Sequence, residues 1–282
     1  MELLLSSAFD QLSSSDPSLV RRGLRHIEGL LAQLCRPINS SGGEDDNTQL
    51  KDKTSAIDTR VADDPAYREF LRLQDGFEWN VCLRLLSCLE KLLGQENNEL
   101  SSILIVSALE ILQGVLLIHR PSRRVFVREV HMTILIDLLD SQLPASVQGA
   151  TVSALVCALV EEWQNIRTFE SLEGLATICT LFKRKSTDKE VKLKILEFLF
   201  FYLIPEPQNA TPVHIKGSAN SVSSSITITP SNVDNDSESV LYTNLQVRTT
   251  EEKQKMLSKY LSNVDTLVNE LKQSQPFGNL MV

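Results

Sequence analysis

Large apolar residues recur through the middle of this chain at an offset of about 43 residues, which lies within the range of known helical repeats. Three sets coincide: Leu109, Leu112, Val115 and Leu116; Val152, Leu155, Ala158 and Leu159; and Ile195, Phe198, Phe201 and Tyr202. Within each set the first three residues are three apart, and the fourth lies four residues after the second, which is typical of the buried face of a helix. The recurrence therefore favours similar helical units packed side by side.

A unit of two or three helices cannot bury its apolar faces alone, so such units stack and need atypical helices at their ends. The offset predicts an all-α fold of armadillo/HEAT-like stacked helical repeats with a C-terminal capping helix. The repeat weakens toward the N-terminus, where Gly94 interrupts a helix whose counterpart continues. We assign residues 1–204 to this helical domain.

Start and stop signals divide the domain into helices. Asp16 and Asp64 are suited to cap helices that begin at Pro17 and Pro65, while Pro37 and Gly94 are suited to end helices. The segment ELSSILIVSALEILQGVLLIH is apolar on all sides, which predicts a helix in the middle of the stack. Further helices are expected at about Phe77–Leu93, Val125–Asp140, Pro144–Trp163, Glu170–Phe182 and Lys189–Ile204, the last with a capping box at Thr187 and Glu190.

Two segments lack this apolar pattern. Residues 38–63 are expected to form a mobile loop, and residues 205–248, rich in Ser, Thr and Asn, a disordered linker. A capping-box spacing at Thr249 and Glu252 then predicts an amphipathic helix over 249–282. We expect this helix to pack back on the domain and to cover apolar residues near Phe198 and Tyr202.

Composition excludes several functions. The chain has 28 basic and 36 acidic residues, so a nucleic-acid partner is not expected. Its acidic start and its eight-residue apolar run Phe198–Pro205 suggest neither a signal peptide nor membrane insertion. Five cysteines without a C-x-x-C pair are typical of a reduced intracellular protein without a zinc site. We expect a soluble protein of the cytosol or nucleus.

Motifs for catalysis are missing from the sequence. It contains no glycine-rich phosphate loop, no G-x-S-x-G and no H-E-x-x-H, and its four histidines are dispersed. The sequence therefore predicts a protein that is not an enzyme and that has no cofactor and no metal. An enzyme whose residues converge only in three dimensions stays open as a rival interpretation.

The segment HRPSRRVFVREV concentrates arginine in an acidic protein, at Arg120, Arg123, Arg124 and Arg128. The repeat places it at the junction between two units, so we expect these arginines on a solvated rim. The alternative is a contact patch for carboxylates or phosphates, which guanidinium groups bind well. A partner surface would add Trp163, Lys192 and Lys194. Thr211 and Thr229, each followed by proline, are possible phosphorylation sites.

Four segments resemble one known family. They are YREFLRLQDGFEWNVCLRLLSCLEKLL, VLLIHRPSRRVFVREVHMTILIDLLD, KEVKLKILEFLFFYLIPE and RTTEEKQKMLSKYLSNVDTLVNELKQSQPFG. Through them the sequence is similar to the cell division control protein 14 family of the fungal septation initiation network, which is unrelated to the phosphatase of the same name. The similarity covers nearly the whole chain and consists of packing patterns, with no catalytic signature.

This resemblance implies an armadillo-like subunit that binds and activates or localises a germinal-centre-type protein kinase. It also implies a role in septation and cytokinesis, in the cytoplasm and at a scaffold of the spindle pole body. The residues by themselves indicate only a non-catalytic helical surface suited to protein binding. An armadillo-type peptide or cargo adaptor is the alternative of the same fold.

Overall fold

The computed structural model describes residues 1–35, 64–95, 98–206, 247–262, 264 and 269. These residues form helices joined by short turns and contain no strand, which confirms the predicted all-α class. The elements are α1 (Glu2–Leu12), α2 (Pro17–Leu34), α4 (Pro65–Asp75), α5 (Val81–Leu93), α6 (Glu99–Ile118), the 3₁₀-helix η1 (Arg120–Val127), α7 (Glu129–Asp137), α8 (Ala145–Leu159), α9 (Trp163–Ser171), α10 (Gly174–Lys183), α11 (Lys189–Leu203) and α12 (Thr250–Leu257).

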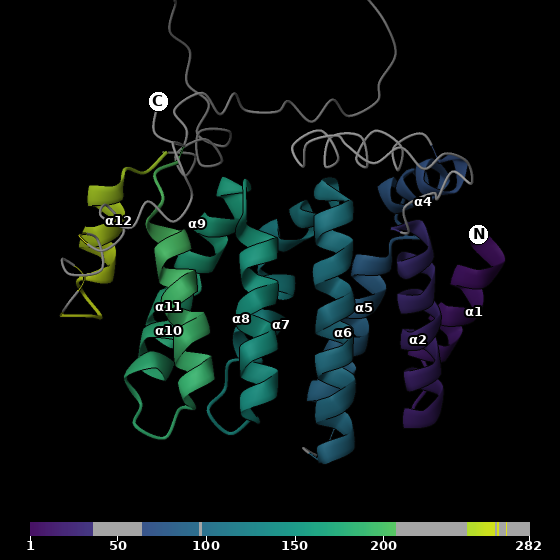
Figure 1. Cartoon of the computed structure of the whole chain (residues 1–282), viewed down its shortest axis with the longest axis horizontal. Helices are drawn as coiled ribbons and strands as arrows, with labels where there is room; N and C mark the ends of the chain where they lie inside the picture. Colours follow the sequence, from purple (N-terminus) through teal and green to yellow (C-terminus); the bar gives the residue numbers. More distant parts are fainter. Residues whose placement is uncertain (36–63, 96–97, 207–246, 263, 265–268, 270–282) are drawn as a thin grey trace, which may run out of the picture.

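The helices form two layers (Figure 1). In one layer the long helices α2, α6, α8 and α11 stand side by side, each in contact with the next. Helices α1, α5, α7, α9 and α10 make the other layer, and α12 lies against α11 at the end opposite α1. A single apolar core runs through both layers, and every residue of the three recurring apolar sets is buried except Phe201, which is half-buried.

Local signals set most helix starts. Asp16 accepts a hydrogen bond from the Ser18 amide, and Asp64 accepts one from Ala66, so both predicted caps are confirmed. The capping box of Thr249 and Glu252 is also present at α12. The capping box expected at Thr187 is wrong, because the Thr187 hydroxyl donates to the Leu181 carbonyl and Asp188 caps α11 instead.

The region from 120 to 183 differs most from the predicted boundaries. A 3₁₀-helix, η1, precedes α7, and the predicted helix over Pro144–Trp163 ends at Leu159. There the backbone becomes extended at Val160 and left-handed at Glu161, with φ 62°. Trp163 therefore begins α9, a short helix that was not predicted. The predicted Phe77–Leu93 helix starts later, at Val81, because Asn80 caps it.

Helix α6 is long and apolar enough to cross a membrane by length and composition alone. Its neighbours α2, α5 and α8 cover much of it, and its ten buried residues include Leu109, Leu112 and Leu116. Such an apolar helix is what the middle of a helical stack requires. The expected loop at 38–63 and most of the expected linker over 205–248 lie outside the described residues. The helix expected over 249–282 ends at Leu257, where a turn follows, and most of its remainder also lies outside the described residues.

Candidate functional site: polar joints between helices and an open groove

Arg123 is buried, contrary to the expectation that it lies on a solvated rim. It is 4% exposed, and its guanidinium donates to the Leu116 carbonyl at 3.0 Å and to the Val160 carbonyl at 3.0 Å. Those carbonyls are at the ends of α6 and α8, where the last turn of a helix lacks backbone partners. Arg123 therefore joins the C-terminal ends of two long helices and is not available to a partner.

The other arginines of this segment are exposed. Arg120 forms an ion pair with Glu161 at 3.1 Å, and Arg124 approaches Glu162 at 4.0 Å. Arg128 lies at the junction between η1 and α7. Because Glu161 also pairs with Arg123, acidic neighbours offset much of the positive charge that a phosphate contact would use.

The joint made by Arg123 has a second member, Asn165 of α9. This side chain is fully buried, and its amide donates to the Ala158 carbonyl at 2.6 Å and to the Arg123 carbonyl at 2.8 Å. It thus closes the end of α8 and links α9 to η1. The signal for this role is weak in the sequence, where Asn165 is one polar residue among others in WQNIRTF.

The remaining predicted contact residues lie apart from the arginines. Trp163 is half-buried against the core at the start of α9. Lys192 and Lys194 are half-buried on α11, and the Lys194 ammonium lies 3.3 Å from the Ser153 hydroxyl of α8. The structure therefore spreads the predicted set over η1, α9 and α11. Thr211 and Thr229 lie outside the described residues.

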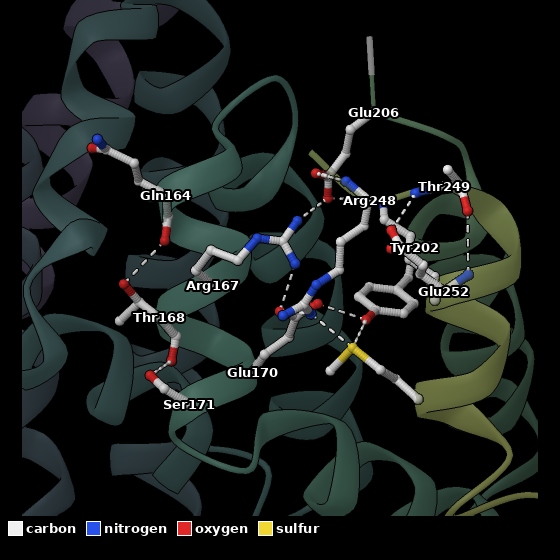
Figure 2. A network of polar contacts seen from close by, with 12 residues as sticks. Gln164, Arg167, Thr168, Glu170, Ser171, Tyr202, Glu206, Arg248, Thr249 and Glu252 are labelled. Carbon is white, nitrogen blue, oxygen red and sulfur yellow. Dashed lines mark hydrogen bonds and ion pairs between the residues drawn. The ribbon is translucent and has the colours of Figure 1, made fainter. Parts of the chain in front are cut away.

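A buried ion network joins α9, α11 and the segment that leads into α12 (Figure 2). Arg167 pairs with Glu170 at 2.7 Å and with Glu206, and Arg248 pairs with Glu170. The Glu206 side chain is fully buried, and its second oxygen accepts the Arg248 amide at 2.9 Å. The Glu206 amide in turn donates to the Arg248 carbonyl, so the chain on either side of 207–246 is held at one place.

Lys253 of α12 completes the network from the other side. Its side chain is 2% exposed, lies 3.1 Å from Glu206 and donates to the Ile204 carbonyl at 2.8 Å. Burial lowers the pKa of Lys253, and the Glu206 carboxylate opposes that shift. Beside it, the Tyr202 hydroxyl donates to Glu170, and burial together with this carboxylate raises the pKa of Tyr202. The phenol is thus held as a neutral donor.

The network holds helices together and offers no open reaction site. Its two carboxylates are each bound by more than one donor and are almost fully buried. Buried thiols are similarly unreactive: burial raises the pKa of Cys88 and of Cys179 to about 11. All five cysteines are free, and the described residues contain no cluster of His, Cys, Asp and Glu that could hold a metal.

Sequence reasoning did not foresee the roles of Glu206, Arg248 and Lys253. Two of them fall at the edges of the expected linker, and Lys253 is a charged residue in an amphipathic helix. Their partners are about forty residues away or more, so local periodicity carries no signal for them.

An open groove of about 690 Å³ lies on the layer of long helices, along the first three turns of α6 and beside the start of α8. Its lining is mainly apolar in exposed area, with acidic groups at two places. The lining residues are Asn98, Glu99, Ser102, Ile103, Val106, Ser107, Glu110, Pro144 and Ser146. None of these residues was among the predicted contacts.

The fold and these sites define a protein whose described residues form a stack of helices. Its buried polar groups join helices to one another, and its long helices present a groove. The chain belongs to the family described as cell division control protein 14, a component of the septation initiation network, whose model matches residues 1–277. It is 30% identical, over 99% of its length and 98% of the relative's, to cell division control protein 14 of Schizosaccharomyces pombe (strain 972 / ATCC 24843). No solved structure matches this chain.

Proposed function

We propose that this chain is a non-catalytic regulatory subunit of the septation initiation network, and that it binds a germinal-centre-type protein kinase. Binding would raise the population of the kinase's active or correctly localised state. Membership of a family of network components in cell division supports the process. The partner class, a germinal-centre-type protein kinase, is supported by what the sequence resemblance to this family implies.

The observation that carries the proposal is how the buried polar groups are used. Arg123, Asn165 and Lys253 each bind carbonyls near the end of a long helix, and Glu206 binds Lys253 together with two arginines. These groups join the helices of the stack to one another. The layer of long helices keeps an open surface, which is what a protein-binding subunit needs.

An armadillo/HEAT-like repeat is part of the same proposal. Each of the helices α6, α8 and α11 has a shorter element after it in the chain: η1, α9 and α12. Side chains of these shorter elements donate hydrogen bonds to carbonyls at the C-terminal ends of the long helices. Two short elements lie between each pair of successive long helices: η1 and α7 between α6 and α8, and α9 and α10 between α8 and α11. Such a stack gives an extended surface on which a partner segment could dock.

Copurification of the full-length chain from its own cells tests the partner class. We expect one protein kinase at a one-to-one ratio, and we expect the kinase to phosphorylate a generic substrate faster with the chain than without it. The purified chain alone should turn over neither phosphoesters nor ATP. Turnover by the chain alone, or copurification of other proteins without a kinase, would contradict the proposal.

A tagged full-length chain tests where the subunit acts. We propose that it is found in the cytoplasm and gathers at the spindle pole body as septation begins, in keeping with a network component. Uniform fluorescence through mitosis and septation would contradict this part of the proposal.

A further inference from the structure

The groove on α6 is built on one face of that helix. Glu99, Ile103, Val106 and Glu110 follow each other at three- and four-residue steps, so they lie in one row along about three turns. At 1.5 Å per residue this row is about 16 Å long. Ile103 is 45% exposed although it lies in the middle of the row, so a substantial apolar surface is left open to solvent.

The two ends of the row are acidic. Glu99 and Glu110 flank the apolar pair Ile103 and Val106, and both carboxylates are exposed. The small side chains of Ser102, Ser107 and Ser146 border the row. This arrangement fits a segment whose apolar residues lie between basic residues, because opposite charges at a rim select the partner and its register.

The groove is better suited to a helix than to an extended strand. An extended segment needs donors and acceptors for its own backbone, and it usually finds them at a sheet edge. Here the wall is helical, and the Asn98 carbonyl and side-chain oxygen are already bound by Ser102 and Ser101. A helix satisfies its own backbone and offers apolar side chains at the same three- and four-residue steps as the wall.

We propose that this groove receives a basic amphipathic helix of the partner kinase. Apolar residues of that helix pack on Ile103 and Val106, and lysine or arginine residues flanking them pair with Glu99 and Glu110. The inference rests on the proposed function and adds to it the surface and the chemistry of the partner segment.

The test measures the affinity of the purified full-length chain for the purified kinase by calorimetry. Ile103→Lys and Glu110→Lys should each weaken binding about tenfold or more, since charge is placed against the apolar or basic part of the segment. Leu100→Lys is the matched control for the first, because Leu100 is on the same helix and 41% exposed but outside the groove. Glu197→Lys on α11 is the control for the second, because Glu197 is also an exposed mid-helix glutamate.

The proposal that the groove receives the kinase helix is refuted if groove and control variants weaken binding equally, or if neither groove variant weakens it. Either result leaves the proposed binding of a kinase intact. If the wild-type chain binds no kinase, the proposed function fails and this inference fails with it. Hydrogen exchange on the kinase in the complex adds a check on the segment. We expect protection of a helical segment with flanking basic residues; protection of an acidic or extended segment overturns the inference. So does a wild-type chain that self-associates and becomes monomeric through Ile103→Lys.

Discussion

Replacing Glu206 by glutamine tests how the ion network holds α12 on the stack. In the wild type the network has three cations, Arg167, Arg248 and Lys253, and two carboxylates, Glu170 and Glu206. Glu206→Gln leaves three cations and one carboxylate in a buried place. Lys253→Met leaves two of each, and methionine fills much of the same volume.

The distances set the expected magnitudes. At 3.1 Å and an effective dielectric constant of about 20, Lys253 and Glu206 attract each other by about 5 kcal/mol, most of which the loss of hydration offsets. Glu206→Gln leaves buried charge uncompensated, so we expect it to cost about 3–5 kcal/mol. Lys253→Met loses its bond to the Ile204 carbonyl, for about 1–3 kcal/mol. The double variant should cost less than the sum of the two by at least about 1 kcal/mol.

Urea unfolding of the full-length chain, followed by circular dichroism, gives these free energies of unfolding if the slope with urea is unchanged. Hydrogen exchange at α12 distinguishes release of this helix from global unfolding. The reasoning is refuted if the two single costs add within about 0.5 kcal/mol, which is the range for independent sites. It is also refuted if Lys253→Met proves more costly than Glu206→Gln.

Four further predictions concern two glycines, a histidine and an asparagine. Gly29→Ala should raise the free energy of unfolding by about 0.5–1 kcal/mol, because Gly29 is at an exposed position of α2 and nothing lies within 4 Å of the added methyl group. Gly174→Ala should lower the free energy of unfolding by about 1–3 kcal/mol, because the methyl group would meet the buried Phe169 ring at 2.2 Å. Burial lowers the pKa of His119, so the unfolded chain binds the proton more readily than the folded chain. The contribution of His119 to stability should therefore be full above about pH 6.5 and fall below it. The free energy of unfolding is measured against pH for the wild type and for His119→Gln, and the difference between the two profiles should isolate this loss. Asn165→Ala should cost about 2 kcal/mol by thermal and urea unfolding, because two buried carbonyls lose their donor; a cost below 0.5 kcal/mol would show that water replaces it.

Much of the fold could be predicted from the sequence because its signals are local. Asp16 with Pro17, Asp64 with Pro65 and Thr249 with Glu252 act over three residues or fewer, and each begins a helix as expected. The all-round apolar character of α6 also predicted its place in the middle of the stack, because a helix without a polar face must be covered. The break after Leu159 was missed because it depends on the left-handed backbone of Glu161. Glutamate rarely adopts this conformation, so its presence in the sequence does not predict a break.

The candidate site could be predicted much less well. Sequence reasoning placed Arg120, Arg123, Arg124 and Arg128 together on the rim. In the structure the ends of α6 and α8 each bring a carbonyl to Arg123, while the residues after α8 bring carboxylates to Arg120 and Arg124. The groove needs α6 beside the start of α8, a contact that neither segment encodes alone.

The sequence by itself determined the helical class and most helix starts, because capping and apolar period are interactions between near neighbours along the chain. Only the tertiary structure decided which charged groups are buried and paired, as at Lys253 with Glu206, and where the long helices leave an apolar row exposed. The physical reason is that burial and Coulomb attraction depend on distance in space, and packing sets that distance between residues far apart in the chain.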